Sequence, residues 1–324
     1  MKVSLDQIRT QSEAALVAHG AAAFQAAEVA RAVTRAEETG NVICGLYYLE
    51  SYCLQLRSGR VDGSVEPKVT RPRPASVTSD ARFGFAQPAF ARAVDTAVSA
   101  ARENGVATLA VKNAHTCTSL GFFIEQIAAR GLVGIGFTNA SPVVAPPGGN
   151  RAVIGTNPIA MTVPGTPEPR LHFDFSTSAV ALGKITMAKA AGEKIPLGWA
   201  VDADGAPTTD PEAALKGALV SAGGYKGWGF GLMAEIMAAA LTGSVNSLDV
   251  KGLKLPDGPP HGLGQFYILI DPATHTDAFD DRFARLAEAV AEQPAARIPG
   301  ASRRTLSQVD VPDALWSLVT RLSA

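Results

Sequence analysis

The sequence is poor in cysteine and in charge, and both shortages narrow what the chain can be. Its three cysteines, Cys44, Cys53 and Cys117, show no CxxC spacing, and an odd count without a secretory segment argues against a disulfide framework. Charged residues make up 18% of the chain and the formal net charge is −1. Such a chain has no basic field that would attract nucleic acid or an anionic membrane. We therefore expect neither nucleic acid nor a membrane among its partners.

A long apolar run is also missing. The most hydrophobic stretch, Trp228 to Leu241, is too short to span a bilayer and contains Glu235. The N-terminal segment MKVSLDQIRT turns polar at once and offers no apolar signal core. These features predict a soluble protein of the cytoplasm.

The nucleotide-binding motifs that glycine usually marks are absent as well. The run 134–136 reads Gly-Ile-Gly, but Asn139 stands where a GxGxxG motif needs its third glycine. The pair Gly183-Lys184 is followed by Ile185, where a phosphate-binding loop needs Ser or Thr. No group of His, Cys, Asp or Glu has the spacing of zinc ligands. The sequence therefore predicts neither a Rossmann nor a P-loop site, and no metal.

What the chain does have is the apolar patterning of a mixed α/β protein. Hydrophobic residues make up 47% of its 324 residues, a globular balance. The patterning predicts helices over residues 4–18, 21–38, 46–58, 89–104, 124–130, 180–191, 233–241, 280–293 and 312–322. It predicts strands over residues 108–112, 132–138, 152–154, 159–163, 171–175 and 265–270. The stretch 67–74 holds three prolines and is interpreted as a connector.

The order of these elements predicts the domain organisation and the type of sheet. We expect an N-terminal helical domain (1–75), a β-rich region (76–290) and a C-terminal segment (291–324) that packs back on the body. Connections between the strands of residues 130–175 are too short for crossover helices, and parallel neighbours need about a dozen residues or more. We therefore expect a largely antiparallel sheet.

Four segments border apolar strands but are too polar and too rich in glycine for ordinary core. They are residues 138–142, 155–158, 174–178 and 223–227. Glycine lets backbone amides approach a ligand closely, and Ser and Thr hydroxyls donate to phosphate or carboxylate oxygens. Asp174 is either a helix cap or a functional carboxylate. Lys226 is either a solvated loop lysine or a point charge for phosphate.

Taken in order, these segments carry a family resemblance. The series TNASPVVAPPGG, IGTNP, DFSTS, GKI, IPLGWAVDADGAPTTDP, GGYKG and RIPG resembles the malate/L-lactate dehydrogenase family. That family includes ureidoglycolate dehydrogenase, diketogulonate reductase and the reductases of Δ1-piperideine-2-carboxylate and Δ1-pyrroline-2-carboxylate. The resemblance covers the chain from its first helix to about Gly300.

The resemblance implies a fold, a cofactor and an assembly. The fold would be non-Rossmann, with a largely antiparallel seven-stranded sheet, in a homodimer whose active sites involve both subunits. The β-rich region would bind NADPH or NADH and a small-molecule carboxylate substrate. The implied cofactor contacts are Asp174, Phe175, Ser176, Thr177, Ser178, Tyr225, Lys226, Gly300, Ala301 and Ser302. The implied substrate contacts are Asn139, Thr156, Asn157 and Pro158, with Thr138 beside them.

The chain departs from the family at the expected catalytic positions. Family members carry Gly-x-x-Ser-His-Gly followed three residues later by Arg, where the histidine donates a proton and the arginine grips the substrate carboxylate. Here Ile43 replaces the serine, Cys44 the histidine and Tyr48 the arginine. A second family histidine is displaced by one place, to His115. The candidate catalytic residues are therefore His115, Asp174, Cys44 and Tyr48.

Each candidate also has a structural interpretation. Cys44 could be a small buried hydrophobe, Tyr48 a pocket wall and His115 an ordinary histidine at a strand end. In the catalytic interpretation His115 orients the substrate or delivers a proton, and Asp174 holds His115 or the nicotinamide ribose. Thr156, Asn157 or backbone amides would then meet the substrate carboxylate.

The departures favour one substrate class. Reduction of a ketone leaves an alkoxide that needs a proton, so a general acid contributes substantially. A cyclic imine can arrive protonated and depends less on a histidine, and loss of the arginine favours a cationic substrate. We therefore expect an NAD(P)H-dependent reductase of a small 2-imino or 2-oxo carboxylic acid, with Δ1-pyrroline-2-carboxylate favoured. A malate/lactate-type 2-hydroxy acid dehydrogenase, a cysteine-nucleophile enzyme and a cofactor-binding protein without catalysis are the alternatives.

Overall fold

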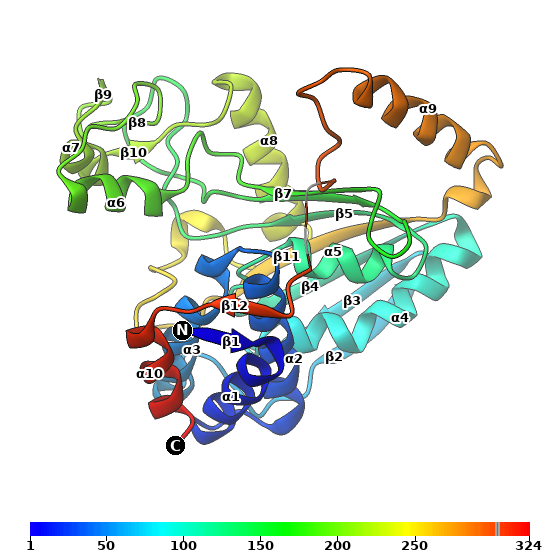
Figure 1. The fold of residues 1–324 in the computed structure, drawn as a ribbon, viewed down its shortest axis with the longest axis horizontal. Helices are drawn as coiled ribbons and strands as arrows, with labels where there is room; N and C mark the ends of the chain where they lie inside the picture. The colour runs from blue at the N-terminus through cyan, green and yellow to red at the C-terminus, as the bar shows by residue number, and fades with distance from the viewer. Residues whose placement is uncertain (302, 304) are drawn as a thin grey trace.

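The two ends of the chain meet in one helical layer. The computed structural model describes residues 1–301, 303 and 305–324. Ser4 and Gln7 form a capping box that starts α1 (Leu5–Ala18), which packs with α2 (Ala23–Glu38) and α3 (Leu46–Ser58). The last helix, α10 (Asp313–Leu322), shares their apolar core, and β12 (Gln308–Asp310) pairs antiparallel with β1 (Lys2–Ser4). Figure 1 shows this layer with its blue and red segments side by side.

A seven-stranded sheet forms the centre of the molecule. Its order is β2 (Lys68–Arg73), β3 (Ser76–Asp80), β4 (Val106–Ala114), β11 (Leu263–Ile270), β5 (Val133–Thr138), β6 (Ile159–Val163) and β7 (Leu171–Phe175). The pair β3–β4 is parallel and the other neighbouring pairs are antiparallel. The sheet is therefore mixed, which corrects the expectation of a largely antiparallel one. The parallel pair arises because α4 (Ala86–Asn104) provides a crossover connection between β3 and β4.

Two local expectations from the sequence were wrong. The proline-containing stretch 67–74 is mostly strand β2 rather than a connector, because β2 is an edge strand and its pairing with β3 skips Pro72 at a register shift. Residues 152–154 form no strand, and only Ile154 makes an isolated bridge to Val144. Short apolar runs of this kind cannot be assigned by periodicity alone.

Helices cover both faces of the sheet. On one face, α4 and α5 (Gly121–Ala128) pack Phe90 and Phe123 against Leu109 and Tyr267. On the other face, α8 (Tyr225–Glu235) and the π-helical turn η2 (Ile236–Ala240) cover Phe137 and Ile159. The helix predicted over 233–241 therefore begins earlier, at Tyr225. Alternate residues of β11 serve the two faces, as a strand between two layers requires.

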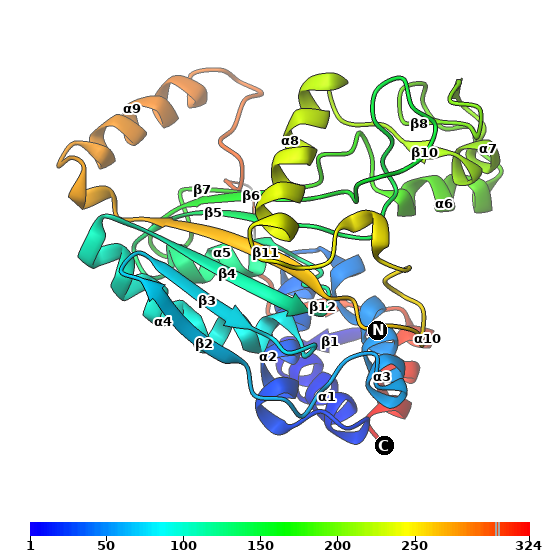
Figure 2. The same ribbon diagram turned by 180° about the vertical axis from the view of Figure 1, so that it is seen from behind.

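A small lobe and one isolated helix extend from this body. The lobe contains α6 (Leu182–Ala191), β8 (Ala200–Val201), β9 (Pro207–Thr208), α7 (Pro211–Lys216) and β10 (Ala218–Leu219). Helix α9 (Phe279–Ala291) has no buried residue and stands apart from the sheet in Figures 1 and 2. Short 3-10 turns complete the chain: η1 (Val42–Cys44), η3 (Ser247–Asp249) and η4 (Pro272–Thr274). Among the described helices, none is both long and apolar enough to cross a membrane.

Candidate functional site

A cavity of about 140 Å3, called the small cavity below, lies where η1 and α3 meet the start of β6 and the end of β5. Its lining residues come from segments far apart in the chain: Ile43, Cys44, Tyr48, Thr116, Cys117, Thr118, Thr138, Asn139, Ala140, Thr156, Pro158 and Leu253. Three of the five stretches that line it, 43–48, 138–140 and 156–158, contain site residues predicted from the sequence. The fold thus brings Cys44 and Tyr48 to the predicted substrate residues Asn139, Thr156 and Pro158.

Buried Glu37 fixes the backbone that carries Cys44 and Tyr48. Its Oε1 accepts a 2.7 Å hydrogen bond from the backbone N–H of Leu46, at the start of α3. A Cβ at Gly45 would lie 2.2 Å from the same oxygen, so any larger residue at this position would displace the Glu37 side chain. Burial raises the pKa of the Glu37 carboxyl above its usual value. The sequence analysis missed Glu37, since nothing in its local pattern distinguishes it from a surface glutamate.

The small cavity is electrically neutral near pH 7. Burial, with a contribution from the negative charge of Asp174, raises the pKa of the Cys44 thiol to about 12. Burial also raises the pKa of the Tyr48 hydroxyl. No charged side chain is present among the described residues that line this cavity. It therefore offers thiol, hydroxyl and amide groups, but no group whose pKa matches general acid catalysis at neutral pH.

His115 lies behind the wall of the small cavity and does not line it. Its ring is 1% exposed, its Nε2 lies 2.7 Å from Oε1 of Gln55, and it stacks on His261 with ring centroids 4.1 Å apart. Burial, followed by the neighbouring His261 and Arg60, holds the pKa of His115 well below its usual value. The imidazole is therefore neutral at pH 7, and it contacts the cavity wall through the adjacent Thr116.

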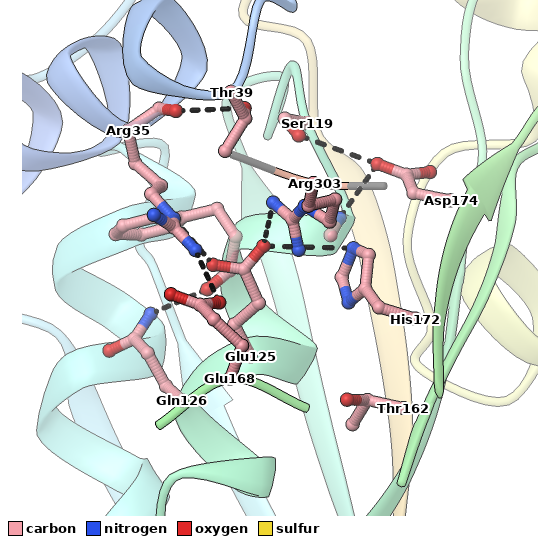
Figure 3. A network of polar contacts seen from close by, with 12 residues as sticks. Arg35, Thr39, Ser119, Glu125, Gln126, Thr162, Glu168, His172, Asp174 and Arg303 are labelled. Atoms are coloured by element: carbon pink, nitrogen blue, oxygen red, sulfur yellow. Dashed lines mark hydrogen bonds and ion pairs between the residues drawn. The ribbon is translucent and has the colours of Figure 1, made fainter. Parts of the chain in front are cut away.

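Asp174 lies at the end of β7, close to Cys44 rather than to His115. Its Oδ2 accepts hydrogen bonds from the backbone N–H of Gly121, at 2.7 Å, and from the Ser119 hydroxyl, at 3.4 Å (Figure 3). It thus caps α5, a helix earlier in the chain than the one its sequence position suggested. Burial raises the pKa of the Asp174 carboxyl, and its charge in turn raises the pKa of the Cys44 thiol.

A larger cavity, of about 700 Å3 and called the large cavity below, adjoins Asp174. Its volume is in the range of about 300 to 1,000 Å3 typical of ligand sites. Its lining residues are Arg35, Ala36, Thr39, Gly40, Asn41, Ser119, Gly121, Phe122, Glu125, His172, Phe173, Asp174, Arg297, Pro299, Gly300 and Arg303. The cavity therefore joins the N-terminal layer, β7 and the C-terminal segment.

Glu125 is the centre of an ionic network in the large cavity. Figure 3 shows its carboxylate between Arg35, Arg303 and His172. The Arg35 Nε lies 2.8 Å from Oε2, Arg303 pairs with Oε1, and the His172 Nε2 lies 3.6 Å from Oε1. Burial and the charge of Arg303 lower the pKa of His172 to about 4, so its ring is neutral at pH 7. The sequence gives no sign of this network, because the partners of Glu125 are distant in the chain.

The predicted turn at Gly300 lies against β7. Pro299 accepts a 2.9 Å hydrogen bond from the backbone N–H of His172, and Gly300 has a φ of +91°. A Cβ at Gly300 would lie 2.9 Å from the backbone N and O of His172, so the position requires glycine. Ala301 is exposed at the same turn. Ser302, the third residue predicted here, lies outside the described residues.

The segment 174–178 is tied to the segment 155–158. The backbone N–H of Thr177 donates to the Thr156 carbonyl at 2.8 Å, and the Thr177 hydroxyl donates to the Asn157 carbonyl at 3.3 Å. Ser178 is buried and its hydroxyl donates to the Val180 carbonyl at 2.8 Å. Ser176 is half-buried, while Phe175 is 54% exposed and stacks on Phe173. The two segments therefore form one unit, with Phe175 on its surface.

The side-chain amides of two predicted substrate residues form hydrogen bonds within the protein. The Asn157 Nδ2 donates to Glu235 at 2.8 Å, and Asn157 does not line the small cavity. Asn139 lines the small cavity, but its Nδ2 donates to the Val245 carbonyl at 2.8 Å and its Oδ1 accepts from the backbone N–H of Gly264 at 3.1 Å. The Asn157 Nδ2 also donates to the Gly231 carbonyl at 3.1 Å, so both amides hold backbone in place. Thr156 and Pro158 are the predicted substrate residues that have no such role.

The start of α8 suits a phosphate group. Gly223 and Gly224 both have a φ of +66° and open space where a Cβ would stand, and Tyr225 and Lys226 are exposed. The buried hydroxyl of Ser221 has no hydrogen-bond partner among the described residues and lines a cavity of about 200 Å3 beside Gly224. Helix N-termini bind phosphate through free backbone N–H groups and the helix dipole. The residues present therefore fit the phosphate groups of a dinucleotide.

Comparison with known proteins gives a consistent result over almost the whole chain. The model of the malate/L-lactate dehydrogenase family matches residues 3–315. A (2R)-3-sulfolactate dehydrogenase (NADP(+)) of Chromohalobacter salexigens is 38% identical, covering 97% of this chain and 95% of that protein. A Δ1-pyrroline-2-carboxylate reductase of Ancylobacter novellus is 39% identical, covering 94% and 90%. The crystal structure of Δ1-piperideine-2-carboxylate reductase from Pseudomonas syringae has a TM-score of 0.91 at 33% identity, covering 99% of both chains.

Proposed function

The chain belongs to the malate/L-lactate dehydrogenase family, and we propose that it reduces a small cyclic 2-imino carboxylic acid such as Δ1-pyrroline-2-carboxylate. It is an NAD(P)-dependent oxidoreductase, as its named relatives are dehydrogenases and reductases.

The main support for the proposal is that the residues lining the small cavity are uncharged near pH 7. An iminium ion already holds its nitrogen proton, so hydride addition at its carbon gives a neutral amine without proton transfer from the protein. A ketone would instead leave an alkoxide, and a positioned general acid contributes about 100- to 10,000-fold to such a step. Neither Cys44 nor Tyr48 can supply that proton readily, because the pKa of each is raised. The cavity therefore suits a substrate that brings its own proton.

The relatives support the same substrate class. The Ancylobacter novellus protein is named a Δ1-pyrroline-2-carboxylate reductase, and a Pseudomonas putida protein, 36% identical, is named a reductase of Δ1-pyrroline-2-carboxylate and Δ1-piperideine-2-carboxylate. Both are covered to about nine tenths of their length. The product from Δ1-pyrroline-2-carboxylate would be proline.

Some residues around the two cavities would bind the cofactor, and others would contact the substrate. Bound NAD(P)H supplies the hydride. The start of α8 with Lys226, the segment 174–178 and the turn at Gly300 would hold it. The start of α8 and the turn contain glycine and exposed residues, and Phe175 is the exposed residue of the segment 174–178. Cys44 and Tyr48 form the uncharged wall that faces the substrate, and Thr156 and Pro158 close the opposite side.

His115 acts as a positioning residue in this proposal. Its Nε2 donates to Oε1 of Gln55, and the Nε2 of Gln55 donates to the carbonyl oxygens of Leu253 at 2.8 Å and Leu255 at 2.6 Å. Leu253 lines the small cavity. His115 would thus set the shape of the substrate site through Gln55, while Asp174 keeps a negative charge beside Cys44.

A panel of substrates tests the proposal. Oxidation of NADH and of NADPH would be followed with Δ1-pyrroline-2-carboxylate, Δ1-piperideine-2-carboxylate, pyruvate, oxaloacetate and 3-sulfopyruvate. We expect kcat/KM for the cyclic imines to exceed that for every ketone by about 100-fold or more, the contribution of a missing general acid. Comparable values for a ketone would contradict the proposal.

A second candidate function has one observation in its favour. The sulfolactate dehydrogenase of Chromohalobacter salexigens is 38% identical over 318 residues, so a 2-hydroxy acid dehydrogenase is the alternative. It would need a proton acceptor at the small cavity, and Asp174 is the ionisable group beside Cys44. Turnover of 3-sulfopyruvate, with loss of that activity in Asp174→Asn, would favour it.

We also propose a homodimer in the cytoplasm. Phe230, Ile236 and Leu241 are more than half exposed along α8 and the residues after it, and α9 has no buried residue, although monomers rarely leave large apolar patches uncovered. A second copy would cover these surfaces and complete the active site, and light scattering would give its mass. The three free cysteines fit a reducing compartment.

A further inference from the structure

The loop 252–259 is pinned across α3 by side chains. Besides the two hydrogen bonds from Gln55, the Arg60 guanidinium donates to the carbonyl oxygens of Gly252 at 3.0 Å, Leu255 at 2.7 Å and Pro259 at 3.0 Å. Ser58 donates to the Pro256 carbonyl at 2.7 Å. Arg60 is 1% exposed, and its guanidinium group donates hydrogen bonds to backbone carbonyl oxygens. Such a network of charged hydrogen bonds holds the loop in one place.

This pinned loop carries Lys254 to the small cavity. The Lys254 Nζ lies 5.0 Å from the centre of the Tyr48 ring, within the range of a cation–π contact. The Tyr48 hydroxyl lies 3.4 Å from the Leu253 carbonyl, and Leu253 lines the cavity. The charge of Lys254 also acts on the Cys44 thiol, where it opposes the effect of burial on the pKa. Lys254 is therefore beside the wall formed by Cys44 and Tyr48.

The Lys254 ammonium group has no anionic partner. In the described part of the chain, Lys2, Lys112 and Lys216 each pair with a carboxylate, whereas none lies within 4.0 Å of Lys254. Lys254 is exposed, so the free protein hydrates its charge. A flexible lysine stem can turn such a charge toward a ligand.

A carboxylate substrate needs a cation that the cavity wall lacks. Burying an unpaired carboxylate is costly, yet the described lining residues carry no positive charge. Arg60 does not line the cavity and already donates to three carbonyl oxygens. We propose that Lys254 binds the carboxylate of the substrate and so determines the specificity of the site, an inference that rests on the proposed function.

The same arrangement would orient the substrate. Lys254 places positive charge at the Tyr48 side of the small cavity, and the uncharged Cys44 lines another part of its wall. A protonated cyclic imine with a 2-carboxylate carries one charge of each sign, on two groups that are bonded to the same carbon. Its carboxylate therefore faces Lys254 and its iminium nitrogen faces the Cys44 side, whereas a substrate without a carboxylate gains nothing from Lys254.

Kinetics of three variants test the inference. In Lys254→Met we expect KM for Δ1-pyrroline-2-carboxylate to rise about 10-fold or more, as loss of a charge-assisted hydrogen bond predicts, with kcat within about threefold of the parent. Lys254→Arg should restore KM to within about threefold. Lys251→Met, which removes an exposed lysine from the same part of the chain, should leave KM unchanged. An unchanged KM in Lys254→Met would overturn the inference.

A binding measurement separates this inference from the proposed function. Calorimetry would compare pyrrole-2-carboxylate, a planar ring that accepts no hydride, with pyrrole-2-carboxamide, its uncharged counterpart. We expect Lys254→Met to weaken binding of the carboxylate about 10-fold or more and to leave binding of the carboxamide unchanged. Such a result without turnover of any imine would refute the proposed reaction and leave the role of Lys254 standing. Equal weakening of both ligands, or of neither, would refute the role of Lys254.

Discussion

The Nε2 of His115 lies 2.7 Å from Oε1 of Gln55, and this contact links a buried histidine to the loop that borders the small cavity. Gln55 is itself fully buried and donates through Nε2 to the loop carbonyls. The amide can satisfy both contacts only if His115 is the donor, which requires a proton on Nε2. The lowered pKa of His115 means that this proton belongs to the neutral ring. The contact therefore defines the state of His115 as well as the position of the loop.

The first prediction concerns His115 and the pH profile. Because burial holds the pKa of His115 well below its usual value, it is neutral from pH 6 to pH 8. We expect His115→Asn to lower the free energy of unfolding by about 2 kcal/mol, the effect of breaking a buried network. Its kcat should change less than about fivefold, and its kcat profile over that pH range should match the parent. An inflection present in the parent and absent from a folded His115→Asn would show instead that His115 donates a proton.

The second prediction concerns stability at acid pH. Burial lowers the pKa of His172 to about 4, below the value of about 6.5 in an unfolded chain, so the unfolded state binds the proton more readily. The stabilising effect of neutral His172 is therefore complete above about pH 6.5 and is lost as the pH falls toward 4. We expect His172 to account for a fall of about 2 kcal/mol in the free energy of unfolding between pH 7 and pH 5. Urea denaturation at the two pH values, with His172→Asn as the comparison, measures it; an identical fall in that variant would assign the effect to other groups.

The third prediction concerns Cys44. With a thiol pKa of about 12, Cys44 is protonated and inert at neutral pH, so it acts as a wall rather than as an acid. Cys44→Ser should keep kcat/KM for Δ1-pyrroline-2-carboxylate within about fivefold of the parent. Cys44→His places an imidazole beside Asp174 and should raise kcat/KM for 3-sulfopyruvate about 10-fold or more. A loss of about 100-fold in Cys44→Ser would mean that the thiol takes part in the reaction.

The fourth prediction concerns Gly300. Alanine there would suffer from the positive φ and from contact with the His172 backbone, so Gly300→Ala should lower the free energy of unfolding by about 3 kcal/mol and weaken NADPH binding. Gly192 is the matched control, since it has a φ of +69° and no atom within 4 Å of the place a Cβ would take, and Gly192→Ala should cost about 1 kcal/mol. Thermal unfolding and fluorescence titration with NADPH compare the two. Equal losses in both variants would show that the contact with β7 is unimportant.

Much of the element order could be predicted from the sequence, because amphipathic helices such as α1 and α2 carry their own period, and α1 also carries a capping box. The parallel pair β3–β4 could not, since β2 and β3 lie in a short, polar, proline-containing stretch. Strand pairing there depends on the position of β2 at the edge of the sheet and on the crossover helix α4, and both are features of the tertiary structure. Local propensity gives no sign of either.

The candidate site also contains residues that could be predicted from the sequence and residues that could not. Cys44, Tyr48, Thr156 and Asp174 lie in glycine-rich or polar segments next to strands, and such segments are visible in a sequence. Lys254 lies in a loop whose position depends on Gln55 and Arg60, almost 200 residues earlier in the chain. Similarly, the partners of Glu125 are 90 residues away at Arg35 and in the C-terminal segment at Arg303. No spacing rule reports contacts of this kind, and buried charge networks appear only once the fold brings their members together.

A competition between two substrates tests the central claim most directly. The enzyme would receive equal concentrations of Δ1-pyrroline-2-carboxylate and 3-sulfopyruvate with a limiting amount of NADPH deuterated at the transferred position, and mass spectrometry would count deuterated proline and deuterated sulfolactate. The product ratio equals the ratio of the two kcat/KM values. A neutral cavity that accepts a protonated imine predicts deuterated proline in excess by about 100-fold or more. Deuterated sulfolactate as the main product would contradict the claim.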